Sequence, residues 1–197
     1  TFNNKQAGTF GVMGTFSTFF SHHMATMEGG FVTTNDEELY HILLSIRAHG
    51  WTRNLPKDNH ITGTKSDDPF EESFNFVLPG YNLRPLEMSA ATGVEQLKKL
   101  PSFISNRRDN AAYFQDLFLD HPFISIQREI GVSSWFGFSM ILKENSPMDR
   151  KSFVKLLSSN GVECRPIVTG NFLKNKAVLE FFDYEVSGSL ENAEYLD

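Results

Sequence analysis

The chain has 197 residues, of which 40% are hydrophobic, and a formal net charge of −6. A hydrophobic share of this size suits a globular protein with a packed core; the acidic balance argues against nucleic acid or an anionic membrane surface as a partner, and no apolar run approaches the ~20 residues that span a bilayer. The single cysteine excludes a disulfide framework within the chain and suits a reducing compartment, so we expect a cytoplasmic protein.

The first predicted elements are two strands, over residues 9–19 and 31–34. Both segments are rich in aromatic residues and threonine, which fit the pleated surface of a sheet. We expect the side chains of Phe16, Phe19 and Phe20 to contribute to a core rather than to an exposed stacking platform.

The segment between these strands carries two adjacent histidines, His22 and His23, and ends in Glu-Gly-Gly at residues 28–30. Small hydroxyl side chains precede the histidines: Ser17, Thr18 and Ser21. The glycine pair allows a tight turn, and an imidazole can move protons near neutral pH. The pattern indicates a loop that holds a phosphorylated cofactor, although an isolated His-His pair would suit an ordinary loop, and a structural role for His23 stays open.

Residues 36–46 carry apolar side chains at helical spacing, with Asp36 in the first turn and Gly50 beyond the end. The stretch 51–79 that follows is polar and interrupted by prolines and a glycine. Long ordered loops are usually functional. We therefore expect a helix followed by a functional loop.

The rest of the chain predicts helices and strands in alternation. They are helices over 87–97 and 101–119, strands over 123–127 and 134–142, a helix over 149–160, a strand over 162–168 and the start of a helix at 192–197. Pro101 stands at a favoured first helical position, and Gly161 at a favoured position after a helix. The remaining histidines are His41, His60 and His121; they lack the spacing of a metal site, so we expect none.

The loop over residues 14–30 resembles the lysine loop of the DegT/DnrJ/EryC1/StrS family of pyridoxal-phosphate sugar aminotransferases. In that family a lysine binds the cofactor covalently and Glu-Gly-Gly follows. Counting back from residues 28–30 puts His22 at the lysine position and Ser17 at the phosphate-binding serine. The resemblance therefore implies pyridoxal 5'-phosphate or pyridoxamine 5'-phosphate, held without a covalent bond.

The resemblance also implies an α/β fold: part of an aspartate-aminotransferase-like large domain, of the type I class of pyridoxal-phosphate enzymes, and a smaller α+β C-terminal domain. Residues 1–100 would belong to the large domain, 101–120 would form a connecting helix and 121–197 would belong to a truncated small domain. Because family members are longer at both ends, we expect an internal fragment, with the aspartate that pairs with the pyridine nitrogen upstream of Thr1.

Histidine at the lysine position is the mark of a subgroup of the family, the sugar 3-dehydratases. The implied reaction uses L-glutamate and the cofactor to remove the C3 hydroxyl of GDP-4-keto-6-deoxy-D-mannose, with release of ammonia and with His22 as the catalytic base. A related branch holds an iron–sulfur cluster on four cysteines, and the single Cys164 cannot provide that set. Further matching segments extend this likeness along the chain: residues 47–56, 63–68, 70–73 and 163–175.

The turn at residues 80–84, Gly-Tyr-Asn-Leu-Arg, resembles a family turn whose asparagine reaches the cofactor phosphate of the neighbouring subunit. The resemblance thus implies a cofactor-binding Asn82 and a homodimer with shared active sites. Arg84 is a candidate for gripping the glutamate carboxylate with a bidentate fork. The further candidates for binding the sugar nucleotide or glutamate are His49, Arg53 and Arg165. The plainer alternatives are a turn asparagine and solvated surface charges.

Two other functions stay open. A sugar-nucleotide 4-aminotransferase of the perosamine-synthase kind needs a lysine in the loop, and none lies between Lys5 and Lys57. A cofactor-binding but inactive regulatory or scaffold subunit could carry many residues at position 22.

Overall fold

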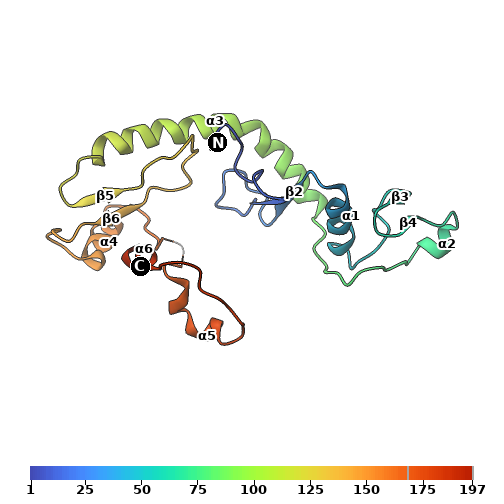
Figure 1. Cartoon of the computed structure of the whole chain (residues 1–197). Coiled ribbons are helices and arrows are strands. Elements are labelled where there is room, and N and C mark those ends of the chain that lie inside the picture. Colours follow the sequence, from blue (N-terminus) through green and yellow to red (C-terminus); the bar gives the residue numbers. More distant parts are fainter. Residues whose placement is uncertain (168, 197) are drawn as a thin grey trace. The chain divides into compact units, whose positions relative to one another are not determined.

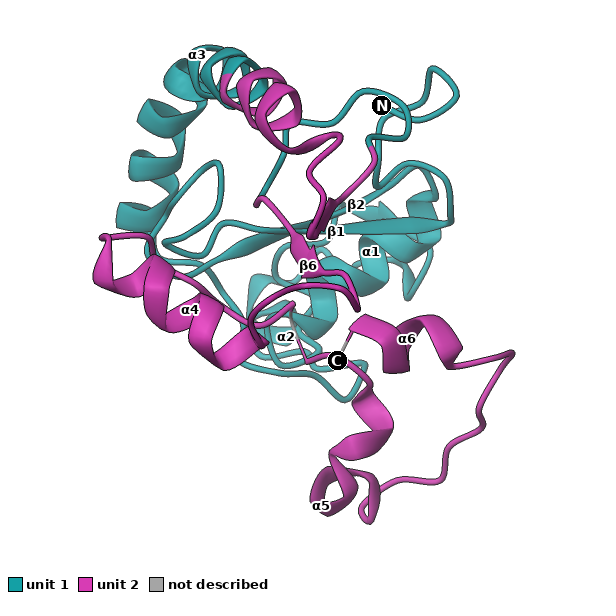
Figure 2. Ribbon diagram, turned by 90° about the vertical axis from the view of Figure 1, so that its left-hand side faces the viewer, with its two compact units in different colours: residues 1–109, 129–136 teal, residues 110–128, 137–197 magenta. Residues whose placement is uncertain are grey.

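The structure is a computed structural model that describes residues 1–167 and 169–196. The chain divides into two compact units (Figure 2): residues 1–109 with 129–136, and residues 110–128 with 137–197. Figure 1 shows the order of the elements along the chain. Within the described ranges, no helix combines the length and the apolar character that a membrane span requires.

The first unit begins with an antiparallel hairpin of β1 (Met13–Ser17) and β2 (Gly30–Thr34). The predicted strands are confirmed in position, although the first is shorter than predicted because the chain turns away from the sheet on both sides. The predicted core role of the aromatic run is wrong for Phe16 and Phe20, which are 42% and 61% exposed. A sheet of only two strands leaves much of each face uncovered.

Helix α1 (Glu37–Ile46) confirms the helix predicted after the hairpin, with the Asp36 carboxylate accepting the amide of Leu39 as the N-terminal cap. The expected loop after it is confirmed as mostly irregular. It also holds three short elements, β3 (Asp58–Asn59), β4 (Gly63–Thr64) and α2 (Pro69–Glu72), of which β3 and β4 pair antiparallel.

The two helices predicted on either side of Pro101 are one continuous helix, α3 (Glu87–Phe118), so the predicted break is wrong. A proline inside a helix removes one backbone hydrogen bond and crowds the preceding turn. Pro101 is exposed on this helix of 32 residues, and the turns on both sides propagate through it because extending a formed helix is easier than starting a new one.

The second unit contains the antiparallel pair β5 (Ile124–Ile126) and β6 (Met140–Leu142), followed by α4 (Arg150–Ser159). The first predicted strand and the helix are confirmed. Of the strand predicted over 134–142, only the end forms, because Trp135 has a φ of +50°, outside the strand region.

The C-terminal part contains η1 (Phe172–Lys174), α5 (Lys176–Leu179) and α6 (Glu191–Leu196). The helix predicted at the end is confirmed up to Leu196, and its last residue, Asp197, lies outside the described residues. The strand predicted over 162–168 is wrong for residues 162–167, which are irregular and have no partner strand among the described residues to satisfy their backbone groups. Val168 lies outside the described residues.

Candidate active site

The histidine loop is closed at its base by two buried threonines, Thr18 and Thr26. Their hydroxyl oxygens lie 2.7 Å apart, and the amide of Thr26 donates to the carbonyl of Thr18 at 2.8 Å. The amide of Thr18 donates in turn to the carbonyl of Gly29 at 3.0 Å. These bonds continue the β1–β2 hairpin and fix both ends of the segment that carries His22 and His23.

His22 lies half-buried between two aromatic rings. Its ring centre is 6.3 Å from that of Phe19 and 5.1 Å from that of Phe136. Its Nδ1 atom is buried and has no hydrogen-bond partner among the described residues. A buried polar atom without a partner is unusual in a folded protein, and no hydrogen bond from the described residues competes for a proton at this nitrogen.

His23 has a different environment from its neighbour. Its Nε2 lies 3.3 Å from the carbonyl oxygen of Ser134, and its ring stacks on Phe136 at 6.1 Å and 16°. Burial, then the positive charge of Arg107, lower the pKa of His23, although the contact with Ser134 opposes them. A lowered pKa keeps this imidazole neutral at pH 7, which suits a donor that holds Ser134 in place rather than a base.

Ser134, Phe136 and Arg107 were missed at the sequence level. The strand predicted over 134–142 placed the first two in a regular sheet. No local signal connects them with a loop more than a hundred residues earlier, since the Ser134–His23 contact has a sequence separation of 111. The fold alone brings them together.

Ser17 is the last residue of β1, opposite Gly30 and exposed. Its hydroxyl oxygen accepts the amide of Phe19 at 3.2 Å. A hydroxyl can donate one bond and accept two, and the Ser17 proton goes to no group in the described part of the chain. It stays available to an anionic ligand.

His49 and Asn82 meet at a backbone junction between the end of α1 and residues 80–84, where the turn expected from the sequence does not form. Ala48 and Asn82 form an isolated antiparallel bridge, and the amide of His49 donates to the carbonyl of Tyr81 at 2.9 Å. Both predicted site residues are exposed. Arg84, two residues further on, is exposed as well.

Arg53 lies on an aromatic stack. Its guanidinium carbon is 4.8 Å from the centre of the Trp51 ring, and Trp51 stacks on both Phe74 and Phe76 at 5.5 Å. Contact with an aromatic face restrains a cation while leaving its N–H groups free to donate. Arg53 is therefore a partly ordered, exposed cation.

The remaining candidate, Arg165, belongs to the second unit. It is exposed and donates to the carboxylate of Glu163 from Nε at 2.9 Å and from Nη2 at 2.7 Å. A ligand carboxylate would have to displace Glu163. The structure thus gathers His49 and Asn82 at one junction and His22 and Ser17 in one loop, but it places Arg165 in a separate local environment.

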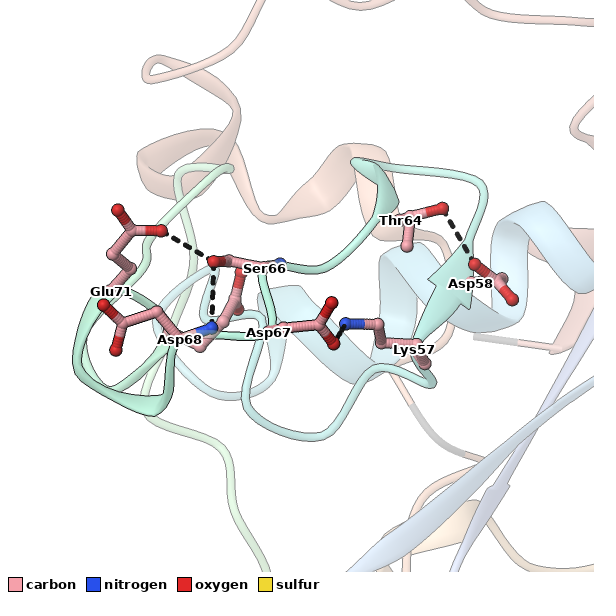
Figure 3. A network of polar contacts seen from close by, with 8 residues as sticks. Lys57, Asp58, Thr64, Ser66, Asp67, Asp68 and Glu71 are labelled. Carbon is pink, nitrogen blue, oxygen red and sulfur yellow. Dashed lines mark hydrogen bonds and ion pairs between the residues drawn. The ribbon is translucent and has the colours of Figure 1, made fainter.

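A polar network orders the segment after Arg53 (Figure 3). Lys57 pairs with Asp67, the Thr64 hydroxyl donates to Asp58 at 2.8 Å, and the Ser66 hydroxyl donates to Glu71 at 2.6 Å. These contacts lie within one hairpin-like loop and are mostly exposed. Exposed ion pairs contribute little stability individually, so the network orders the loop more than it stabilises the fold.

Glu72 ties this loop to the stack that carries Arg53. Its carboxylate accepts the hydroxyl of buried Thr52 at 2.8 Å and the amide of Ser66 at 3.0 Å. The Thr52 hydroxyl, followed by the Ser66 amide, lowers the pKa of Glu72 below its ordinary value of 4.5. The carboxylate is therefore the form that stabilises the loop.

We expect this stabilisation at neutral pH and its loss as the pH falls below 4.5 through the pKa of folded Glu72, because the depressed folded value lies below the unfolded one. Glu72→Gln should lower the thermal midpoint at neutral pH, and the difference from the unaltered protein should shrink in acid. Thermal unfolding across this pH range measures it. A difference in thermal midpoint that stays constant with pH would contradict the stabilising role of the Glu72 carboxylate.

The hairpin loop and the fold define the class of protein. The DegT/DnrJ/EryC1/StrS aminotransferase family matches residues 1–196, and the chain belongs to this family. The predicted family is therefore confirmed.

Two relatives are especially similar. The chain is 72% identical over 195 residues to the GDP-4-keto-6-deoxy-D-mannose 3-dehydratase of Yersinia pseudotuberculosis, covering 99% of this chain and 50% of that protein. It is 70% identical over 197 residues to the enzyme of the same name from Escherichia coli O55:H7, covering 100% of this chain and 51% of that protein. The chain thus spans about half the length of the curated relatives it matches.

Solved structures of similar enzymes have closely similar folds. The E. coli GDP-4-keto-6-deoxy-D-mannose-3-dehydratase with bound hydrated PLP has a TM-score of 0.96 and 70% identity, over 100% of this chain and 50% of that one. A structure of GDP-4-keto-6-deoxymannose-3-dehydratase with a trapped PLP-glutamate geminal diamine also has a TM-score of 0.96, with 70% identity over 100% of this chain and 51% of that one. The aminotransferase PseC of Helicobacter pylori, at 24% identity and a TM-score of 0.73, over 100% of this chain and 48% of that one, shares the fold. These likenesses confirm the predicted fold class.

Proposed function

We propose that the protein containing this chain is a pyridoxal-phosphate-dependent sugar-nucleotide 3-dehydratase. It removes the C3 hydroxyl of GDP-4-keto-6-deoxy-D-mannose as water. L-glutamate supplies both the nitrogen and the two electrons and leaves as 2-oxoglutarate, and hydrolysis then releases ammonia and the 4-keto-3,6-dideoxy sugar nucleotide. The observation that carries the proposal is the Nδ1 of His22, unpaired among the described residues, at the position where the resemblance to the aminotransferases implies a lysine. The identity of 72% and 70% to two enzymes of this name supports it.

The residues present fit the cofactor. An exposed serine hydroxyl with an undonated proton, on Ser17, and the exposed amide of Asn82 are groups that can bind its phosphate. His22 offers a nitrogen but no amine, so the cofactor would be held by non-covalent contacts alone. When bound, the cofactor supplies an electron sink that makes loss of the sugar hydroxyl feasible.

His22 is the proposed base and takes up the proton at its unpaired Nδ1. An imidazole can accept and return a proton near neutral pH. Because it cannot form a covalent bond with the cofactor, it does not compete with the sugar for that position. Phe19 and Phe136 flank the ring and restrict access of water to it.

The charged candidates would bind the two substrates. Arg53, ordered on Trp51, and exposed Arg84 can each donate two parallel bonds to a phosphate or to the glutamate carboxylate. Exposed His49 can donate a hydrogen bond from its ring, and Arg165 would take part after exchanging Glu163 for the ligand.

The same proposal includes a homodimer with shared active sites, in which exposed Asn82 reaches the neighbouring subunit's cofactor, and a cytoplasmic location. It also assigns residues 1–100 to the cofactor-binding large domain, 101–120 to a connecting helix and 121–197 to the small domain. Size-exclusion chromatography with light scattering would test the dimer.

The decisive experiment uses the protein expressed from its complete reading frame, with pyridoxal phosphate, L-glutamate and GDP-4-keto-6-deoxy-D-mannose. We expect stoichiometric ammonia and a product that mass spectrometry identifies as the dideoxy sugar nucleotide. A 4-amino sugar formed without ammonia would instead indicate an aminotransferase. Cofactor binding with no turnover of either kind would indicate a regulatory or scaffold subunit.

A further inference from the structure

The turn at residues 133–136 has a strained backbone beside both histidines. Trp135 is 3% exposed and has a φ of +50°. A positive φ is uncommon for residues other than glycine and rarer still for bulky ones. Such a conformation persists only where the surrounding contacts over-determine it, and it is found preferentially at functional sites. The contacts that hold this turn are therefore of functional interest.

Two arginines of α3 hold the turn. Nη1 of Arg107 donates to the carbonyl oxygens of Trp135 at 2.9 Å and Phe136 at 3.3 Å, and Nε of Arg108 donates to that of Ser133 at 3.0 Å. Hydrogen bonds from a charged donor are shorter and stronger than neutral ones. Because the donors stand on a helix, they attach the turn to a rigid element.

Residues of this turn also contact both histidines. The Phe136 ring lies 5.1 Å from that of His22 and 6.1 Å from that of His23, and Nε2 of His23 lies 3.3 Å from the carbonyl oxygen of Ser134. Arg107 is near enough for its charge to lower the pKa of His23, as the second cause after burial. Arg107, Phe136 and the two imidazoles thus form one continuous set of contacts.

Packing has to orient His22, because neither ring nitrogen makes a hydrogen bond to a described residue, the buried Nδ1 included. Catalytic imidazoles are usually oriented by a hydrogen bond to the second ring nitrogen. Here the rings of Phe19 and Phe136 take that place. Phe19 is fixed by the same loop as His22, so Phe136 is the support that depends on a distant element.

We propose that Arg107 is a positioning residue for His22. By binding the carbonyl groups of Trp135 and Phe136, it holds the Phe136 ring against the imidazole and so fixes the direction of the unpaired nitrogen. The effect on catalysis rests on the proposed function, whereas the effect on the two histidines does not. Arg108, which binds the turn only at Ser133, provides the matched control on the same helix.

The test compares Arg107→Met, Arg107→Lys, Arg108→Met and Phe136→Leu in the protein expressed from its complete reading frame. A misplacement of about 1 Å in a catalytic group can cost about a hundredfold in rate, so we expect Arg107→Met and Phe136→Leu to lower kcat by about ten- to a hundredfold with little change in KM. Arg107→Lys, which can still donate to one carbonyl, should recover part of the loss. Arg108→Met should keep kcat close to that of the unaltered protein.

Imidazole resonances, followed by NMR as a function of pH, provide a readout that does not require turnover. Arg107→Met should raise the pKa of His23, because a nearby positive charge is removed, and should shift the His22 ring signals; Arg108→Met should do neither. If the unaltered protein releases no ammonia but these shifts occur, the proposed function fails and the positioning role stands.

Equal losses in the Arg107 and Arg108 variants, or unchanged His22 signals in Arg107→Met, would overturn the positioning role. If Arg107→Met does not fold, Phe136→Leu decides the matter, because it keeps both arginine contacts to the turn. Full activity in that variant would also overturn the proposal.

Discussion

His22→Asn is expected to abolish deoxygenation and to leave cofactor binding nearly unchanged. Asparagine keeps a polar side chain of similar reach but cannot take up a proton near neutral pH. General base catalysis contributes about 10²–10⁴-fold in rate, and the neighbouring imidazole of His23 is turned toward Ser134. Ammonia release and cofactor titration in the complete protein measure the two effects.

His60→Asn is a suitable control, because His60 is exposed and pairs with Glu37 outside the histidine loop. It should retain full activity. If His22→Asn lost cofactor affinity in proportion to its rate, His22 would be a binding residue and not the base. His22→Lys should produce the opposite change: a new cofactor absorbance band, from covalent attachment, and a shift toward transamination.

Gly50→Ala is expected to be the most damaging single-methyl change in the first unit. Gly50 has a φ of +82°, and an added Cβ would lie 1.6 Å from the carbonyl oxygen of Leu78. The amide of Gly50 also donates to Ser45 at 2.9 Å, and its carbonyl accepts the amide of Val77 at 2.8 Å. Because the three nearest atoms are all backbone atoms of Leu78, the clash cannot be relieved by a side-chain rotation.

The left-handed conformation alone costs an ordinary residue about 1–2 kcal/mol, and the clash adds to that. We expect a large fall in the thermal midpoint, together with weaker binding of substrate and cofactor, because the junction that carries His49 and Asn82 must open. Gly63→Ala separates the two terms: Gly63 has a φ of +74°, and a Cβ there meets nothing within 4 Å. Similar losses in both variants would mean that the contact with Leu78 contributes nothing.

Several features of the fold and the site could be predicted because their cause is local. The β1–β2 hairpin and the Asp36 cap of α1 follow from side-chain periodicity and capping residues within a few positions, whereas the turn expected around Asn82 does not form and Asn82 pairs with Ala48 instead. The lysine-to-histidine exchange at His22 was visible because the loop around it has a recognisable order of residues.

The predictions that were wrong also have identifiable physical causes. Pro101 does not interrupt α3, the segment 162–167 has no partner strand in the part of the chain that the structure describes, and Phe16 is exposed on an incompletely covered sheet. For residues 162–167 and Phe16 the outcome depends on what packs against or pairs with the segment, whereas Pro101 is accommodated because a formed helix propagates through it. The residue pattern indicates which secondary structure a segment prefers, whereas burial and strand pairing decide which one it forms.

By itself, the sequence determined the family, the histidine loop and the order of the local elements, because these depend on residues close together along the chain. Only the tertiary structure decided that Phe136 packs on His22 and that Arg107 holds the turn behind it. Contacts between distant segments arise from which surfaces are buried together, and the backbone of Trp135 is held in its strained form only when those contacts exist.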